Sequence, residues 1–474
     1  MGKTVRIELL TKVEGHGRVT IHLDDTGHVE HAHFHVTEFR GFEKFCQGRT
    51  LWDMPNITSR ICGICPVSHH LAAVKAAEAV LGVTPPPAAH KLRELMHMGQ
   101  LIQSHALHFF FLAGPDFILD EATAPKDRSV AGVVAKDPEL ARQAIALRKV
   151  GQDVVDAVGG RPIHPVTAVP GGQTMPLSHE ARHLLSRRMS GAVELAESAA
   201  ELAQRFLETH QERLPSMGDR PTLHLGMVRD DATLELYDGD LRLVDAGGTV
   251  VDHFIAADYA SRLAERVEPN SYLKSPYYLP RGFEGGTYRV GPLARLNVAH
   301  RIPTSRAHRQ LQRYREHVGS TTTNENLHYH WARTIEILYA VERAAELLAD
   351  DDVVSEDCRV PVEPRAGEGV GVIEAPRGTL IHHYAADDRG KITKVNLIVA
   401  TAHNNRAIDG AVGDVARLHV SGNELTEGIL NRVEMAVRCF DPCLSCSTHA
   451  LGQMPLRVDL VDAHGTLLQT RQSG

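Results

Sequence analysis

The sequence predicts an α+β protein that is mainly helical, with a core of long antiparallel helices and β-hairpins packed outside it. Three observations predict this class. Apolar residues recur at helical spacing over several segments, two of which are much longer than three turns. Other segments alternate apolar and polar residues and are joined by short runs of turn residues. No internal repeat or low-complexity linker divides the chain of 474 residues.

The β-hairpins are predicted from alternation on either side of a turn. Near the N-terminus, Val19, Ile21 and Leu23 point to one side, residues 24–27 turn, and residues 32–39 return. Two later segments are also predicted to be β-rich: residues 222–254, with turns at 238–239 and 246–248, and residues 370–400, with a turn at 387–390.

The helices are predicted from apolar periodicity and from residues that start or stop a helix. An apolar stripe begins near Ser68 and ends at Gly82. After three prolines, residues 88–113 read as one long helix with Gly99 as its internal glycine. Ser178 is placed to cap a second long helix. This helix is expected to reach about residue 213, and two shorter ones are expected at residues 327–348 and 426–439.

Composition excludes several classes of protein. The chain carries 51 Lys and Arg against 59 Asp and Glu, a net charge of −8, which gives no electrostatic case for nucleic acid or an anionic membrane as partner. No apolar run reaches the roughly 18 residues of a transmembrane segment, and none is expected. The first residues lack a secretory signal, and seven Cys are too few for a disulfide scaffold, so we expect a cytoplasmic protein.

Two CxxC pairs, Cys62 with Cys65 and Cys443 with Cys446, are the strongest chemical signal. Thiols three residues apart at a helix end can share a metal ion, and two such pairs complete a four-thiolate site. The pairs lie at opposite ends of the chain, which excludes a local zinc ribbon. Spacing favours a buried metal site over two redox motifs or a coincidence.

Both segments resemble the metal-binding motifs of the large subunit of nickel–iron hydrogenases, RxCGxCxxxH near the start and DPCxxCxxH near the end. The chain matches both without a gap. The resemblance implies the fold of that family and heterolytic cleavage or formation of H2. It extends through short segments in the family order: residues 13–16 (VEGH), 40–43 (RGFE), 164–165 (HP) with 170–172 (PGG), 291–295 (GPLAR) and 374–378 (EAPRG).

The resemblance further implies that four cysteinates hold nickel and that two of them bridge to an iron carrying carbon monoxide and cyanide. Carried onto this chain, Cys62 and Cys443 are terminal nickel ligands, and Cys65 and Cys446 are the bridges. Soft thiolates suit nickel. Glu14 is by composition a solvent-facing residue, but the resemblance makes it the group that takes a proton from the terminal cysteinate.

Other residues receive roles from the same resemblance. Glu43 and His449 are expected to ligate magnesium or a similar hard cation, together with a backbone carbonyl of residues 396–400. Pro376 and Arg377 are expected beside the open nickel–iron position and a cyanide, because a guanidinium is always charged and has several donors.

His69 is expected to donate a hydrogen bond to a bridging thiolate, and Asp441 to pair with Arg377 or to cap the last turn. Taken alone, a histidine of this kind is an ordinary core residue. One departure concerns Ser104, which stands where many membrane-bound relatives have Asp. The carboxylate network above the metals is therefore expected to be thinner, with Arg377 held differently.

Partners are required by the chemistry. The remaining cysteines, Cys46, Cys358 and Cys439, form no iron–sulfur motif, and no GxGxxG follows a predicted strand. Electrons must therefore leave through another protein. The resemblance implies a small subunit with an iron–sulfur cluster. The residues within the two cysteine motifs are most similar to those of cytoplasmic enzymes that reduce NAD through diaphorase subunits binding NAD and flavin. Linkage to NADP or coenzyme F420, a hydrogen sensor, and a non-catalytic subunit like that of respiratory complex I are the alternatives.

The resemblance divides the chain into one multilayered domain, residues 1–449, and a C-terminal extension, residues 450–474. A maturation protease is expected to cut after His449 once nickel chaperones have loaded the site. The extension reads as a small hairpin. While attached, it could hold the second cysteine pair away from the metals during assembly of the site.

Overall fold

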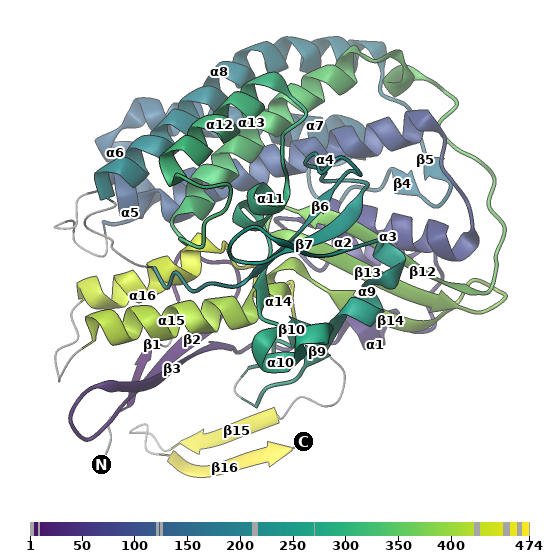
Figure 1. Cartoon of the computed structure of the whole chain (residues 1–474). Coiled ribbons are helices and arrows are strands. Elements are labelled where there is room, and N and C mark those ends of the chain that lie inside the picture. Colours follow the sequence, from purple (N-terminus) through teal and green to yellow (C-terminus); the bar gives the residue numbers. More distant parts are fainter. Residues whose placement is uncertain are drawn as a thin grey trace.

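The structure is a computed structural model of the whole chain. The residues it describes are 4–7, 10–119, 123, 127–210, 217–269, 271–420, 427–448, 456–461 and 467–473. The long helices lie together at the top of Figure 1, and most of the sheets and shorter helices lie below them. The predicted class, α+β and mainly helical, is confirmed.

Four long helices form the core: α4 (Pro87–Leu107), α7 (Pro138–Gly159), α8 (His179–His210) and α13 (His328–Ala349). Helices α4 and α8 each pack against both α7 and α13, so the four close into a ring (Figure 1). Two glycines allow α4 and α7 to approach closely, because a Cβ atom at Gly99 would lie 2.8 Å from the carbonyl oxygen of Gly151.

A three-stranded antiparallel sheet packs against helix α3 (Pro66–Leu81). Its strands, in the order β12 (Gly367–Ala375), β13 (Gly378–Ala386) and β14 (Ile392–Ile398), contain the hairpin predicted at 370–400. Glycines let β12 lie directly on the helix, because a Cβ atom at Gly371 would be 2.3 Å from the carbonyl oxygen of Ala72. The tight β12–β13 turn and the start of α3 are thereby held side by side.

The N-terminal hairpin is confirmed as β2 (Gly17–Leu23) and β3 (Val29–Val36), with an additional strand β1 (Thr4–Ile7) beside β2. The three residues predicted to face inward, Val19, Ile21 and Leu23, are buried. The β-rich middle forms β6 (Leu223–Val228), β7 (Asp240–Val244) and β8 (Val250–Phe254), and the tail hairpin forms β15 (Leu456–Val461) with β16 (Leu467–Ser473).

The remaining elements are shorter and connect these layers. The helices are α1 (Phe42–Cys46), α2 (Met54–Ser59), α5 (Pro115–Ile118), α6 (Val130–Lys136), α9 (Tyr259–Arg262), α10 (Gly282–Gly285), α11 (Pro292–Val298), α12 (Ser305–Val318), α14 (Ala400–His403), α15 (Asn405–His419) and α16 (Glu427–Cys439). The strands are β4 (Ala168–Val169), β5 (Gly172–Gln173), β9 (Leu263–Arg266), β10 (Ser275–Tyr278) and β11 (Tyr288–Arg289), and 3₁₀ turns occur at η2 (Ala256–Asp258), η3 (Leu279–Arg281) and η4 (Asp351–Val354).

The structure refines the helix predictions. The helix predicted over residues 88–113 is α-helical only to Leu107 and then widens into a π-helix, η1 (His108–Ala113), of a kind often found at functional sites. Helix α8 is described to His210, and its predicted last residues lie outside the described part. Helices α7, α12 and α15 were not predicted, although their apolar residues do recur on one face at helical spacing.

Candidate metal centre

The two cysteine pairs meet in the interior of the protein. Cys62 and Cys65 lie at the start of α3, where Cys65 is the N-cap, and Cys443 and Cys446 lie in the loop after α16. The Sγ atoms of Cys62 and Cys443 are 3.5 Å apart, and those of Cys65 and Cys446 are 3.8 Å apart. All four sulfurs lie within 4.8 Å of one another, and all four residues are buried. Converging soft donors of this kind fit a metal centre.

The thiols of this cluster have unequal acidities. Burial raises the pKa of Cys443 and that of Cys446 well above the usual value. Hydrogen bonds from the neighbouring thiols lower the pKa of Cys62. The cluster by itself therefore carries one thiolate readily and resists further ionisation. Metal binding must displace the remaining protons, as thiolate sites require.

Arg40, in the RGFE segment, holds the two cysteine loops together. Its guanidinium donates to the carbonyl oxygen of Ile61 at 2.6 Å and to that of Ser445 at 3.1 Å. The first loop is also held from α4, because Gln100 and Gln103 both donate to the carbonyl oxygen of Ile64. The sequence predicted no role for these side chains, and their spacing carries no signal for one.

Glu14 lies directly on the cysteine site. The Cys443 thiol donates to Oε2 of Glu14 at 3.0 Å, and the backbone N–H of Ser445 donates to the same oxygen at 3.2 Å. The hydroxyl of Ser445 donates to the other carboxylate oxygen. The backbone carbonyl of Glu14 accepts from the N–H of Leu444 at 2.9 Å, which pins the VEGH segment against the second cysteine loop. The carboxylate is thus in reach of a proton on Cys443.

Arg377 is buried at the β12–β13 turn and faces the cysteines. Its guanidinium donates to Oδ1 of Asp441 at 2.9 Å and contacts the hydroxyl of Ser104 at 3.4 Å. The expected pairing with Asp441 is therefore present, and Ser104 occupies the predicted place beside the arginine. Burial raises the pKa of Asp441. Burial opposes the charge on Arg377, but Asp441 and the cysteine sulfurs raise the pKa of Arg377 above its usual value.

A second arginine positions that turn. Arg295, from the GPLAR segment, donates to the carbonyl oxygens of Ala375 and Pro376. It also pairs with Glu336 and Glu374, and all three side chains are completely buried. A buried, fully hydrogen-bonded ion network is costly to break, so it fixes where Arg377 points.

A small cavity lies beside Cys65 and Cys446, on the side of the expected bridging thiolates. It is a space that the side chains leave open between the sulfurs and the β12–β13 turn. Besides three of the cysteines, its lining residues are His69, Ala375, Pro376, Arg377, Leu380, Val399, Ala400 and Thr401. Thr401, which the sequence did not single out, also accepts a hydrogen bond from the backbone N–H of Cys443 at 2.9 Å.

His69 is buried on α3 and borders this cavity. Its Nδ1 atom lies 3.2 Å from Nε2 of His382, whose Nδ1 atom lies 2.6 Å from the hydroxyl of Tyr384. Among the described residues, Nε2 of His69 has no hydrogen-bond partner. Burial lowers the pKa of His69 to about 4, so the ring is neutral at pH 7. A buried nitrogen without a partner next to the sulfurs, Nε2 of His69, is free to donate to a group bound at the cysteine site.

The expected cation site is brought together only in part. The carboxylate of buried Glu43 accepts from the backbone N–H of Leu397 at 3.0 Å, which places it at the segment expected to supply a carbonyl ligand. Lys274 lies 3.5 Å from Oε1 of Glu43 and was not predicted. Burial raises the pKa of Glu43. His449, the other expected ligand, lies outside the described residues.

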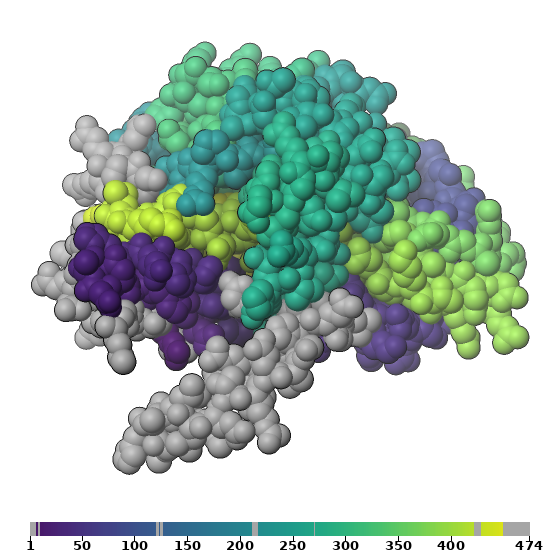
Figure 2. Space-filling model, turned by 60° about the horizontal axis from the view of Figure 1, so that its bottom comes forward, coloured from purple at the N-terminus to yellow at the C-terminus, as the bar shows by residue number. Residues whose placement is uncertain are grey.

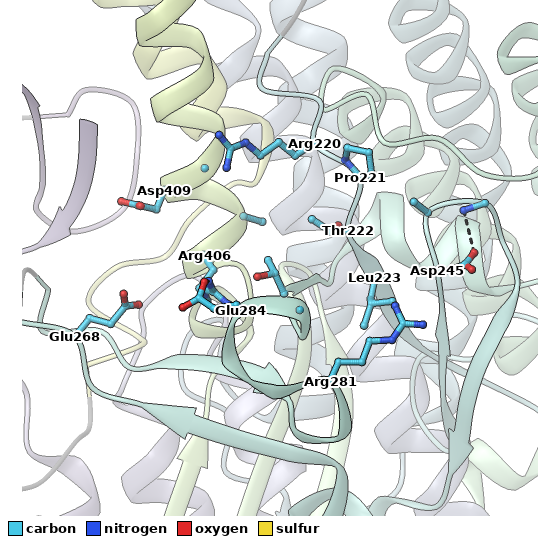
Figure 3. A pocket seen from close by; sticks show the side chains of 16 residues that line it. Arg220, Pro221, Thr222, Leu223, Asp245, Glu268, Arg281, Glu284, Arg406 and Asp409 are labelled. Carbon is cyan, nitrogen blue, oxygen red and sulfur yellow. Dashed lines mark hydrogen bonds and ion pairs between the residues drawn. The ribbon is translucent and has the colours of Figure 1, made fainter. Parts of the chain in front are cut away.

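A cavity of about 640 Å³ lies elsewhere in the described part of the chain. Figure 3 shows acidic and basic side chains around it, contributed by several separate segments of the chain. Arg220 pairs with Asp414, and Arg406 pairs with Glu284. The cavity shares no lining residue with the small cavity beside the cysteines. Its mixed charge and separate position give it no role in the chemistry of the sulfurs.

Fold and site together define a metal-dependent oxidoreductase in which thiols, a carboxylate and a guanidinium face one another. The chain belongs to the nickel-dependent hydrogenase family, because the sequence model of that family matches residues 40–140 and 225–449. A second family model, HoxL-like, matches residues 4–39. The predicted resemblance is confirmed, and membership of the family supports nickel and iron as the metals, with the four-cysteine cluster as a group that could hold a metal ion.

Relatives match over almost the whole chain. The corresponding chain of the F420-non-reducing hydrogenase from Methanothermobacter thermautotrophicus is 45% identical over 98% of both sequences. NAD-reducing hydrogenase HoxS subunit beta of Cupriavidus necator is 42% identical over 99% of this chain and 100% of its own. A crystal structure of NAD+-reducing [NiFe]-hydrogenase in the H2-reduced state superposes with a TM-score of 0.91, at 46% identity, over 94% of this chain and 99% of that one. The Ni-Fe-Se hydrogenase of D. vulgaris Hildenborough, 23% identical with a TM-score of 0.78, shares the fold.

Two further findings concern the sequence predictions. In the part of the chain that the structure describes, no helix is long and apolar enough to cross a membrane. The expected effect of residues 450–474 on the second cysteine pair stays a prediction, since residues 449–455 lie outside the described part. In the described residues the four sulfurs converge, and Glu14, Thr401 and Arg40 each make a hydrogen bond to the second cysteine loop.

Proposed function

We propose that the chain is the catalytic large subunit of a hydrogenase that splits or forms H2 and exchanges the electrons with NAD through partner subunits. The observation that carries this is the contact between the Cys443 thiol and Glu14 at a buried four-sulfur site. It puts a proton acceptor 3.0 Å from a proposed terminal nickel ligand. Heterolytic cleavage of H2 requires such an acceptor next to the metals.

The chain's own residues then have separate tasks. Cys62 and Cys443 are the proposed terminal nickel ligands, and Cys65 and Cys446 are the proposed bridges to iron. The bound nickel and iron would supply the site at which H2 is polarised. Glu14 takes the proton from Cys443 and moves it outward, and the Ser445 hydrogen bonds hold the carboxylate in line.

Residues around the small cavity are proposed to hold the carbon monoxide and cyanide ligands of the iron. Pro376 and the aliphatic residues exclude water, while Arg377 offers donors to an anionic ligand. His69, with a neutral ring, is proposed to donate from Nε2 to a bridging thiolate. His382 and Tyr384 keep its other nitrogen occupied.

A divalent cation, magnesium or similar, is proposed to bind Glu43, His449 and a backbone carbonyl of residues 396–400. Its charge would compensate a buried carboxylate at the end of the processed chain. Lys274 lies close enough to share in that compensation.

Partner subunits and compartment are part of the proposal. A small subunit with an iron–sulfur cluster would take electrons from the site, and diaphorase subunits with flavin would deliver them to NAD in the cytoplasm. The likeness to two NAD-reducing enzymes supports this acceptor. Coenzyme F420 and NADP are the competing acceptors. The test is H2-dependent reduction of each by the purified complex: reduction of NAD alone supports the proposal, and reduction of only another acceptor contradicts the NAD linkage.

Catalytic turnover separates an enzyme from a hydrogen sensor or an inactive relative. All four cysteines are present and converge, which disfavours a complex-I-like subunit that lacks the metals. We expect H2 oxidation at tens of turnovers per second or more, about the median of enzymes in general. A rate orders of magnitude lower with full metal content would favour a sensor.

Replacing Arg377 by lysine is expected to lower H2 oxidation by roughly 10²–10³-fold, the usual loss when one oriented charge-stabilising donor is removed. Lysine keeps the charge, but a single ammonium cannot hold Asp441 and reach the cavity at once. Metal content and H2 uptake are the measurements. Arg389→Lys, in the exposed β13–β14 turn, is the matched control and should retain full activity. An equally active Arg377→Lys enzyme would remove the guanidinium from the mechanism.

Active enzyme is expected to lack residues 450–474, cut away after His449. A tail leaving from a residue three positions beyond Cys446 would have to thread out of the interior, and its removal would let the new carboxylate settle at the cation. Intact-mass measurement of active enzyme is the test, with chain from nickel-depleted cells as the uncut control. A fully active chain that still carries the extension contradicts this prediction.

A further inference from the structure

The outer face of the N-terminal hairpin carries a row of histidines that the proposed hydrogenase chemistry does not use. His31, His33 and His35 alternate along β3, and His22 on β2 stands directly opposite His31. The apolar residues between them point to the core, so the imidazoles all lie on the other face of the sheet. In Figure 2 these N-terminal strands, in purple, lie on the surface beside helices of the C-terminal part, in yellow-green.

Neighbouring rings of this row lie close together, and the rings of His22 and His31 are stacked with an angle of 24° between their planes. The ring centroids of His22 and His31 are 4.2 Å apart, and those of His31 and His33 are 5.2 Å apart. Imidazole nitrogens bind transition metals at about 2.0–2.1 Å, which places the centroids of two rings about 4.5–5.3 Å apart at usual coordination angles. The observed spacings are near that range, and binding requires the stacked rings to rotate so that their nitrogens converge on the ion. His35 is engaged elsewhere, because its Nε2 atom lies 2.6 Å from the hydroxyl of Thr20.

Carboxylates stand behind two of the rings. Nδ1 of His33 faces Asp409 on α15 at 3.6 Å, and Nδ1 of His31 faces Glu30 at 3.9 Å. Both distances exceed hydrogen-bond length, so these carboxylates would orient the ring nitrogens only after the rings rotate toward an ion. The His31 and His33 side chains are 44% and 38% exposed, so a hydrated ion can reach them and the rings can rotate toward it.

We propose that His22, His31 and His33 form a surface site for a divalent transition-metal ion of the kind that favours imidazole, such as nickel or zinc. The ion would bind by exchange of its water molecules for ring nitrogens, with solvent at its remaining positions. Glu30 and Asp409 would offset its charge, against the opposing charge of Arg6 on β1. The three proposed ligands all come from the hairpin, and the site does not depend on the proposed function.

The test is the amount of labile metal held by the intact holoenzyme. After treatment with a chelator, the protein is dialysed against Ni²⁺ or Zn²⁺ alone, and bound metal per chain is measured. We expect one additional ion that the chelator removes again. His22→Gln, His31→Gln and His33→Gln should each weaken its binding by about tenfold or more, and the triple variant should lose it. His28→Gln, in the exposed turn of the same hairpin, is the matched control.

Two outcomes would overturn the site: no labile ion in the unmodified enzyme, or an ion that the triple variant retains. H2 oxidation should stay unchanged in these variants, which separates this site from the cysteine centre. A second measurement needs no variant. Bound Zn²⁺ should protect the three histidines, but not His28, from acylation by diethylpyrocarbonate, read by peptide mass spectrometry. Equal modification with and without zinc would also refute the proposal.

Discussion

Replacing any one of Cys62, Cys65, Cys443 or Cys446 by serine is expected to abolish H2 turnover and stable nickel binding. The sulfurs lie within 4.8 Å of one another in a buried cluster, so each is a neighbour of every other. A serine oxygen is harder, sits on a shorter bond and stays protonated, and it cannot replace a soft thiolate toward nickel. We expect turnover to fall below detection and nickel per chain to fall to a small fraction of the wild-type amount.

Nickel and iron analysis and H2 oxidation are the two measurements. Cys358→Ser is the matched control, because that thiol is also buried but only donates to the carbonyl oxygen of Gln173 at 3.5 Å. It should keep its metals and its activity. A serine variant at one of the four positions with full nickel and full turnover would remove that residue from the ligand set.

Replacing Glu14 by glutamine is expected to preserve the metals and to slow H/D exchange and H2 oxidation by roughly 10²–10⁴-fold, the usual worth of a positioned acid–base group. The amide has nearly the same shape and can still accept from Cys443, but it cannot take up and release a proton. The amide oxygen can keep the contacts with Cys443 and with the N–H of Ser445, and the Ser445 hydroxyl can accept from the amide NH2 where it now donates to the carboxylate. The substitution should therefore disturb the second cysteine loop little.

The measurements are metal content, the H/D exchange rate and the infrared bands of the diatomic ligands, which should be unchanged. Glu38→Gln is the control, since Glu38 is a nearby carboxylate that pairs with exposed His16 and touches none of the cysteines. Glu14→Asp should fall between the two, because it keeps the carboxylate but shortens the reach to Cys443. Normal exchange in Glu14→Gln with normal metals would mean that another group accepts the proton.

Glu14, the proposed proton acceptor, and Arg377, the proposed source of positive charge, are held by different parts of the chain. Glu14 is fixed by the second cysteine loop, whereas Arg377 is fixed by Asp441 and by the buried Arg295 network behind its turn. The network includes no carboxylate at position 104, where Ser104 makes only a long contact of 3.4 Å. Arg377 therefore depends on Asp441 more than it would with a second acid beside it.

The sequence by itself favoured a four-thiolate site and predicted the hairpins and three of the four long core helices. Two CxxC pairs carry a four-thiolate centre in their spacing, and alternation with Asp- and Gly-rich turns was enough to predict the hairpins at residues 17–36 and 378–398. The long helices around Gly99 and Ser178 followed from periodicity and capping. These features are local, because hydrophobic periodicity and turn residues can be recognised within a short stretch of consecutive residues.

Only the tertiary structure decided how these parts meet. Arg40 joins two loops that are distant in the sequence, His382 and Tyr384 stand behind His69, and Thr401 anchors Cys443. The contacts of Arg40 with Ser445, of His69 with His382 and of Thr401 with Cys443 leave no pattern in the sequence, because each joins residues that are far apart along the chain. The same holds for the histidine row: alternation placed the imidazoles on one face, but only strand register set His22 opposite His31.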